Sequence, residues 1–177
     1  MNINDSLTEK NKRAKKMMLW FGMISMSMTF AGLTSAYVVS SSRSDWIEQI
    51  DLPFAFTIST FLLLLSSGTF HLALKSIKET LLKRAQSLLL ITLVLSLVFI
   101  YFQFQGFREI IEQGYYFTGA ESSITTSYLY VLVLLHLAHL IAGIVIVLIV
   151  FYNSFREKYS EANTLGFEMA VTFWHFL

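Results

Sequence analysis

The chain has 177 residues, of which 55% are hydrophobic and 14% charged, with one proline and no cysteine. Together with a mean hydropathy of +0.59, this composition is too apolar for an ordinary soluble domain and predicts an all-α membrane protein. The lack of cysteine excludes disulfides, thiolate metal sites and cysteine nucleophiles, and a formal net charge of only +1 gives no reason to expect nucleic acid as a partner.

The chain opens with a basic tail over residues 1–16, followed by a first apolar run over about 17–40. No small-residue cleavage site follows this run, so we interpret it as a retained membrane span and not as a signal peptide. Small and polar residues recur along one face of it at spacings of three and four, which predicts a seam for close helix packing, because lipid supplies no hydrophobic drive between helices. The seam residues are Gly22, Ser25, Thr29, Gly32 and Ala36.

The second and third spans are predicted over about 52–74 and 85–105, each long enough to cross a hydrocarbon core of roughly 30 Å. The second span carries a further set of polar residues that we expect to face the bundle. They are Thr57, Thr60, Ser67 and His71. The third span is aliphatic nearly all round apart from Thr92 and Ser96, so we expect much of its surface to meet lipid or another subunit.

The fourth span, over about 127–152, places His136, His139 and Gly143 at positions i, i+3 and i+7. Residues at these spacings share one face of a helix. Two imidazoles and a point of close helix approach are therefore expected on the same face, with Gly143 as a packing position.

The fifth apolar run begins near residue 165 and is still apolar at residue 177, which is roughly half the length that a span needs. We predict that the last helix is truncated in this sequence and that the native chain continues, because a terminal carboxylate near mid-bilayer would be costly. Glu168, Thr172 and His175 lie on one face of this helix, at positions i, i+4 and i+7.

The lysines and arginines alternate between the connectors. Eleven of the thirteen fall in the tail and in the second and fourth connectors, and two fall in the first and third connectors. The eleven are Lys10, Lys12, Arg13, Lys15, Lys16, Lys75, Lys78, Lys83, Arg84, Arg156 and Lys158. Because positive charge is retained on the cytoplasmic side during insertion, the sequence predicts one membrane domain of five transmembrane helices with a cytoplasmic N-terminus.

Three interpretations stay open for the ionisable residues of the spans, which are His71, His136, His139, Glu168 and His175. They can form interhelical polar contacts or bind lipid headgroups; His139 and His175 could ligate a haem; or Glu168 and the histidines could conduct protons. A metal site on His136 and His139 would need a further ligand. We favour the first interpretation and assign no catalytic, metal-binding or cofactor-binding residue. Asn153 or a lipid headgroup is the expected partner of Glu168.

The order of several short motifs resembles that of cytochrome c oxidase subunit III. The most specific are the His136 to Gly143 face, Gly166-Phe167-Glu168 and Trp174-His175-Phe176. Supporting matches are Thr34-Ser35-Ala36-Tyr37, Pro53, Thr60, Ser66-Ser67, Gln103 and Gly106. The resemblance covers essentially the whole chain and is to the five-span bacterial form of the family.

The resemblance implies a multi-pass subunit of a respiratory haem-copper terminal oxidase in the bacterial cytoplasmic (inner) membrane. It implies that subunits I and II are partners, that haem and copper lie in those subunits with no cofactor in this chain, and that phospholipid is bound. It further implies that this subunit catalyses nothing alone but supports oxygen reduction coupled to proton translocation, in the oxidase or in a larger respiratory supercomplex.

One position departs from the family pattern. Many members carry a glutamate after an Ile-Ser pair on the first of these helices, whereas Ile24-Ser25 is followed here by Met26. The alternatives to cytochrome c oxidase subunit III are subunit III of a quinol oxidase, a b-type membrane cytochrome and a small transporter. The absence of an internal repeat and of interrupted spans counts against the transporter.

Overall fold

The computed structural model describes residues 3–43, 46, 53–114, 124–156, 158–159 and 164–177. Five helices make up this part of the chain: α1 (Ile3–Ser40), α2 (Phe54–Lys78), α3 (Leu82–Glu112), α4 (Ile124–Phe155) and α5 (Leu165–Phe176). Four of them, α1 to α4, are long and apolar enough to cross a membrane. The five predicted spans are confirmed as helices. Apart from the first, their bounds differ from the predicted ones by up to seven residues, the largest difference being at the end of α3, which continues to Glu112. Residue 52, predicted to open the second span, lies outside the described residues.

Helix α1 differs most from its predicted span, because it begins at Ile3 and so includes nearly all of the basic tail. Its 38 residues correspond to a rod of about 57 Å. That is nearly twice the thickness of a hydrocarbon core of about 30 Å. The basic segment is therefore a helical extension of the first span.

The other helix ends have local causes in the sequence. Pro53 stands at the N-cap of α2 with φ −55°, where a residue without an N–H group is tolerated. Between α2 and α3 the chain reverses within a few residues, and Leu81 N–H donates to the Ser76 carbonyl at 2.9 Å. Thr80 adopts φ +60° in this turn, a left-handed conformation that is unfavourable for a β-branched residue.

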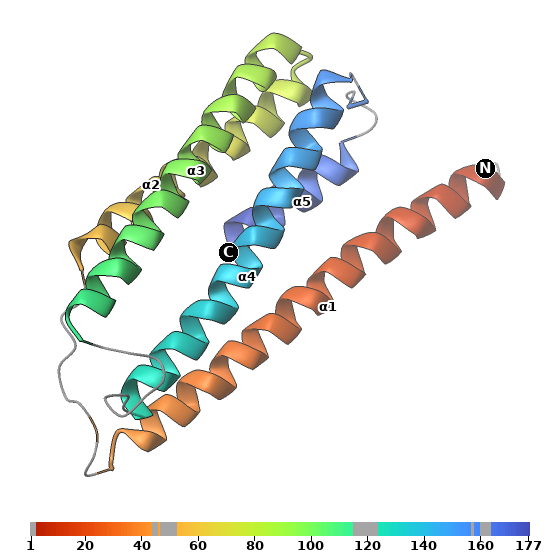
Figure 1. Ribbon diagram of the computed structural model, residues 1–177. Coiled ribbons are helices and arrows are strands. Elements are labelled where there is room, and N and C mark those ends of the chain that lie inside the picture. The colour runs from red at the N-terminus through yellow and green to blue at the C-terminus, as the bar shows by residue number, and fades with distance from the viewer. Residues whose placement is uncertain (1–2, 44–45, 47–52, 115–123, 157, 160–163) are drawn as a thin grey trace.

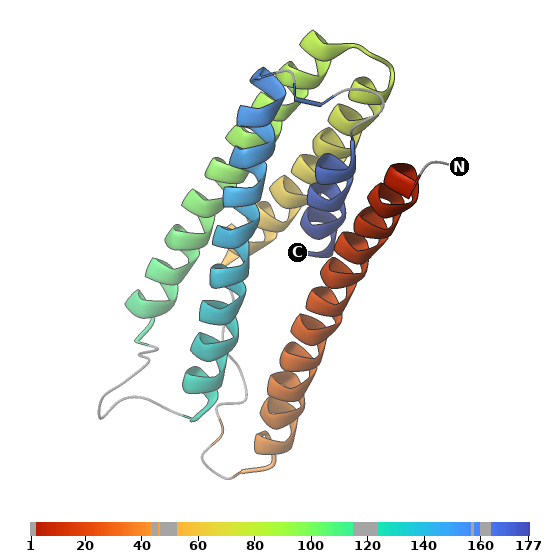
Figure 2. The ribbon, with the colours of Figure 1, turned by 90° about the vertical axis from the view of Figure 1, so that its right-hand side faces the viewer.

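The helices form a bundle in which α2 and α3 run side by side and antiparallel, while α1 stands at the opposite edge (Figures 1 and 2). Helix α5 contacts α2, α4 and α1, and α1 touches only α4 and α5 among the described helices. The N-terminal end of α1, the α2 to α3 turn and the C-terminal end of α4 lie at the same end of the bundle (Figure 1). We call this the basic end, since Lys16, Lys78 and Arg156 lie there.

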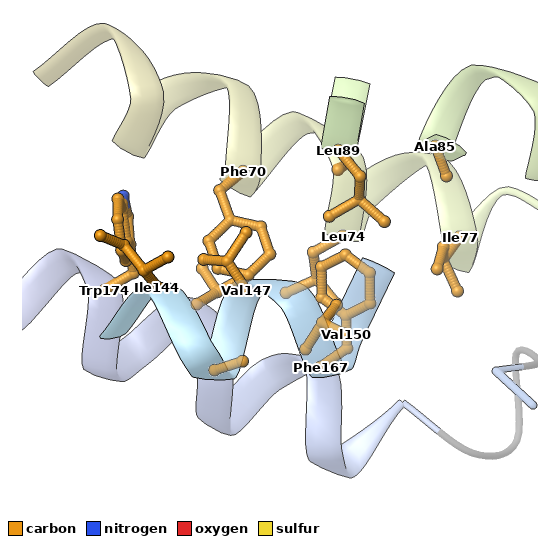
Figure 3. Close-up of a cluster of buried hydrophobic side chains, with 13 residues drawn as sticks. Phe70, Leu74, Ile77, Ala85, Leu89, Ile144, Val147, Val150, Phe167 and Trp174 are labelled. Atoms are coloured by element: carbon orange, nitrogen blue, oxygen red, sulfur yellow. The ribbon is translucent and has the colours of Figure 1, made fainter. Parts of the chain in front are cut away.

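The buried apolar core lies between α2, α3, α4 and α5, toward the basic end (Figure 3). Phe70, Leu89, Val147 and Phe167 are fully buried in it, and Trp174 is 2% exposed. Phe70 contacts the rings of both Phe167 and Trp174, with centroids 5.4 and 6.4 Å apart. This core fixes α5 against α2 and α4, whereas α1 contributes nothing to it.

Helices α2 and α3 are joined by hydroxyl and amide contacts along their length. Thr69 Oγ1 and Thr92 Oγ1 lie 2.8 Å apart, and Ser66 Oγ and Ser96 Oγ lie 3.5 Å apart. A further contact joins the other half of the pair, where Gln103 Nε2 donates to Ser59 Oγ at 3.0 Å. Buried hydroxyls that bond across helices hold them together in an apolar solvent.

These contacts correct one expectation. Thr57 and Thr60 are exposed, so the predicted bundle-facing stripe of the second span is wrong at these two positions. The face that packs on α3 carries the fully buried Ser59 and Ser66 instead. On α3, Thr92 and Ser96 are 0% exposed against α2, and contact of its exposed aliphatic side with lipid or another subunit stays a prediction.

Candidate functional site

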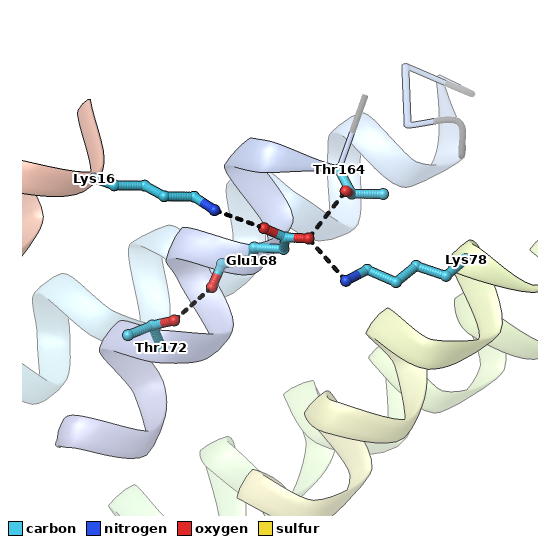
Figure 4. A network of polar contacts seen from close by, with 5 residues as sticks. All are labelled: Lys16, Lys78, Thr164, Glu168 and Thr172. Atoms are coloured by element: carbon cyan, nitrogen blue, oxygen red, sulfur yellow. Dashed lines mark hydrogen bonds and ion pairs between the residues drawn. The ribbon is translucent and has the colours of Figure 1, made fainter. Parts of the chain in front are cut away.

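Glu168 lies in the first turn of α5, where three helices meet at the basic end (Figure 4). Its Oε2 is 3.2 Å from Lys16 Nζ of α1, and its Oε1 is 2.8 Å from Lys78 Nζ of α2. Thr164 Oγ1 donates to Oε1 at 3.2 Å. The carboxylate also stands near the positive N-terminal end of its own helix, where negative charge is favoured. One side chain therefore links α1, α2 and α5.

The partners of Glu168 differ from the expected ones. Asn153, which the sequence suggested, instead hydrogen bonds with the Tyr159 phenol in the connection to α5. Burial raises the pKa of Tyr159 above its ordinary value, and that hydrogen bond opposes the rise. Lys16 and Lys78 are far from Glu168 in sequence, so no spacing rule could have paired them with it. Their position at helix ends that the charge distribution assigns to one side of the membrane was the available signal.

His136 and His139 of α4 face α1. The ring of Phe30 on α1 lies 6.2 Å from the His136 ring and 5.5 Å from the His139 ring, centroid to centroid. These side chains line two neighbouring pockets between α1 and the rest of the bundle, of about 160 and 370 Å³. Both line the smaller pocket, and the Nδ1 atom of His139 is buried without a hydrogen-bond partner in the described structure.

The other two histidines meet each other. His71 of α2 and His175 of α5 are both exposed, and their ring centroids lie 5.8 Å apart. The four histidines thus form two separate pairs. The ring contact of His139 is with α1 and that of His175 is with α2, so the polar faces of α4 and α5 do not face one another. Among the described residues, no group of three or more His, Cys, Asp or Glu side chains could hold a metal ion.

The predicted packing positions divide into two cases. Gly143 is buried, and a Cβ at this position would lie 3.2 Å from Trp174 and collide with Leu177, so α4 and α5 approach closely here. On α1, by contrast, Ser25, Thr29 and Gly32 are exposed and Gly22 and Ala36 are half-buried. A Cβ at Gly22 or Gly32 would meet no atom within 4 Å. Packing of this stripe on another helix stays a prediction.

The face of α1 that does pack is apolar and was not predicted. Met23 is buried at 4% exposure, and Phe30 and Tyr37 follow on the same face. Tyr37 contacts Tyr128 of α4 at the far end of the bundle, with ring centroids 6.5 Å apart. The spacing of these residues by seven, two turns of a helix, was the signal in the sequence. Because every face of a membrane helix is apolar, this signal stands out little from the rest of the helix.

Comparison with known proteins gives the family of this bundle. The family model described as cytochrome c oxidase subunit III matches residues 15–177. The chain belongs to this family. Its described helices α2 to α5 and all of α1 except the basic extension fall inside the matched region.

Named relatives occur in two kinds of terminal oxidase. Subunit 3 of the cytochrome bo(3) ubiquinol oxidase of Buchnera aphidicola is 27% identical over 100% of this chain and 87% of its own length. Cytochrome c oxidase subunit 3 of Alkalihalophilus pseudofirmus is 33% identical over 84% of this chain and 69% of its own. The corresponding protein of Bacillus sp. strain PS3 is 27% identical over 98% and 83%. This subunit III is therefore a component of a haem-copper terminal oxidase, an oxidoreductase complex.

Proposed function

We propose that this subunit III is a non-catalytic, five-span component of a respiratory oxidase in a bacterial cytoplasmic membrane, where it packs on subunit I and supports oxygen reduction coupled to proton translocation. The observation that carries the proposal is the family match over residues 15–177, which covers the helical bundle apart from residues 3–14 of α1. Haem and copper belong to subunits I and II in this proposal.

The distribution of charge supports a cytoplasmic N-terminus. The tail and the second and fourth connectors, which hold eleven lysines and arginines, attach to helix ends that lie together at the basic end (Figure 1). Positive charge at one end of a membrane bundle marks the cytoplasmic side.

Two features support binding of phospholipid. A pocket of about 250 Å³ at the basic end is lined by Lys12, Arg13 and Lys16 together with Glu9, Thr164 and Glu168. Arg13 and Lys16 pair with the two glutamates, and the basic residues outnumber the acidic ones. Lysine and arginine next to the membrane attract anionic headgroups. The outer surfaces of α3 and α4 carry exposed apolar side chains such as Leu97 and Ile141, which suit contact with acyl chains.

Glu168 and the histidines serve packing and lipid contact in this proposal. Both carboxylate oxygens of Glu168 are engaged by Lys16, Lys78 and Thr164, which suits a fixed structural anion better than a carboxyl group that exchanges protons. The ring contacts of His136 and His139 are with α1, whereas His71 and His175 contact each other, so among the described residues no ring contact joins the two pairs.

The electron donor has two candidates. Relatives named as cytochrome c oxidase subunits and relatives named as ubiquinol oxidase subunits match at similar identity. We propose cytochrome c as the donor of the complex, with a quinol as the second candidate. Oxygen consumption by the purified complex with each donor in turn separates the two.

Affinity purification of the tagged full chain from native membranes, followed by identification of the retained proteins, tests the proposed function. We expect subunits I and II in stoichiometric amounts. A chain that retains no other oxidase subunit but binds haem itself would point to a b-type cytochrome instead, and a colourless chain without oxidase partners would overturn the proposal.

A further inference from the structure

The outer surfaces of α3 and α4 are apolar over the central part of each helix. Between residues 88 and 104 of α3, and between residues 131 and 152 of α4, every exposed side chain is aliphatic or aromatic. On α4 these include Ala138 and Ala142. Such a surface is suited to lipid, because its polar side-chain atoms are the hydroxyls of Tyr101 and Tyr152, which lie toward the ends of the predicted spans, where tyrosine is common.

The side of the bundle formed by α2 and α5 is different. Gly68 and His71 of α2 and Thr172 and His175 of α5 are all exposed there, and we call this group the α2–α5 face. The two imidazoles are neighbours, with centroids 5.8 Å apart. His71 lies seven residues from Lys78, the last residue of α2, or about 10 Å along the helix from the charged end. Ionisable groups at such positions rarely face lipid.

Among the described residues, the imidazoles of the α2–α5 face have no acidic partner, although His175 hydrogen bonds with the backbone of Val171. The neighbouring carboxylate, Glu168, is already bound by Lys16 and Lys78. A neutral imidazole carries one N–H donor and one acceptor, and in the membrane these groups need partners. Gly68, one turn from His71, presents no side chain, and a Cβ there would meet no atom within 4 Å. A helix surface without a side chain at this position allows the backbone of a neighbouring helix to pack closely against it.

We propose that a transmembrane helix of another oxidase subunit packs on the α2–α5 face and presents a hydrogen-bond acceptor, best a carboxylate, between His71 and His175. The inference rests on the proposed function, since it requires a multi-subunit oxidase. The proposal places the partner helix on the α2–α5 face and lipid on the α3–α4 side. The close approach occurs at Gly68, and the two imidazoles set the depth of the partner's acidic side chain.

Because the chain has no cysteine, a single introduced thiol can report what covers each face. Gly68→Cys and Ala142→Cys are matched variants, since both replace a small exposed residue in mid-helix. Each is expressed in the complete oxidase, labelled with a photoactivatable benzophenone maleimide and irradiated. Products that carry this chain's tag are then identified.

We expect Gly68→Cys to crosslink to another oxidase subunit and Ala142→Cys to crosslink to phospholipid only. The reverse pattern, or lipid adducts alone from Gly68→Cys in a complex that retains its other subunits, would overturn the assigned face and leave the proposed function standing. Failure of the unsubstituted tagged chain to retain any oxidase subunit would instead count against the proposed function.

A second measurement addresses the histidines. The double variant His71→Ala with His175→Ala should lower the amount of partner subunit retained per tagged chain by about fivefold, the effect of losing about 1 kcal/mol of association. Gly68→Leu should cause a similar loss by steric exclusion, whereas Ala142→Leu should cause none. Full retention in both the His double variant and Gly68→Leu would contradict the proposal.

Discussion

Glu168 binds two lysines from two other helices, so its removal affects how three elements fit together. Each ion pair is partly exposed, with Glu168 at 28% and its lysines at about half, and such pairs contribute about 0–1 kcal/mol each. Glu168→Ala should therefore loosen α1 and α5 and release bound phospholipid, while the assembled oxidase keeps turning over. Oxygen consumption and retained phospholipid are the two readouts.

The matched control for this variant is Glu112→Ala. Glu112 pairs with Arg108 within the same helix at 2.9 Å, so its loss disconnects no elements and should leave both readouts unchanged. Complete loss of oxygen consumption in a fully assembled Glu168→Ala complex would show that the carboxylate takes part in turnover.

Thr80 is the second residue with a clear individual effect. A non-glycine residue in the left-handed region costs about 1–3 kcal/mol, and glycine adopts φ +60° freely. Thr80→Gly should therefore raise the thermal unfolding temperature of the purified complex. Glu79→Gly is the control, because Glu79 has φ −88° and gains nothing from glycine. An unchanged or lowered unfolding temperature for Thr80→Gly would show that the turn is not strained.

At the level of helices, Gly143 sets the distance between α4 and α5. Gly143→Leu introduces a side chain where Trp174 and Leu177 already lie, and overpacking of this kind typically costs about 1–3 kcal/mol. We expect a lower unfolding temperature, measured against Ala142→Leu, whose neighbouring position is exposed. Equal unfolding temperatures for the two variants would mean that α5 moves aside without cost.

The contact between Thr69 of α2 and Thr92 of α3 allows the free energy of an interhelical hydroxyl contact to be measured. Thr69→Val and Thr92→Val each remove one partner of the 2.8 Å contact, and interhelical hydrogen bonds of this kind contribute about 0.6 kcal/mol on average. A double-mutant cycle should therefore show a favourable coupling energy of about that size. A coupling indistinguishable from zero would mean that each hydroxyl is satisfied by its own helix.

The helices themselves could be predicted from the sequence, and their faces only in part. Long apolar runs located the five helices, although α1 begins at Ile3 and α3 ends at Glu112, well beyond the predicted bounds. The faces were harder, because hydrophobicity has little contrast around a membrane helix. Polar residues of the second span were taken to face the bundle, which fails for Thr57 and Thr60. The partners of Glu168 depend on how three helices are packed, which no local pattern contains.

At the scale of the whole molecule, the arrangement separates three surfaces of different chemistry. The basic end carries Lys16 and Lys78, the α3–α4 side is apolar, and the α2–α5 face carries His71 and His175. Such a division suits the proposed position of the subunit between lipid and a larger partner. The buried core lies between α2, α3, α4 and α5, whereas α1 contacts only α4 and α5 among the described helices.

The orientation of the bundle gives a prediction at this scale. Lys83→Cys and Glu112→Cys place single thiols at exposed positions near opposite ends of α3. In intact spheroplasts, a membrane-impermeant maleimide should label Glu112→Cys and leave Lys83→Cys unlabelled until the membrane is broken. Labelling of Lys83→Cys alone would reverse the proposed orientation, and labelling of both would contradict a span at α3.

The most direct test of the central claim is the haem content and oxygen consumption of the material that the tagged chain retains from native membranes. Membership of a terminal oxidase predicts that haem absorbance and oxygen consumption co-purify with the chain in a fixed ratio, and that the chain separated from its partners is colourless. A chain recovered intact and abundant, with neither haem-bearing partners nor oxygen consumption, would contradict the account.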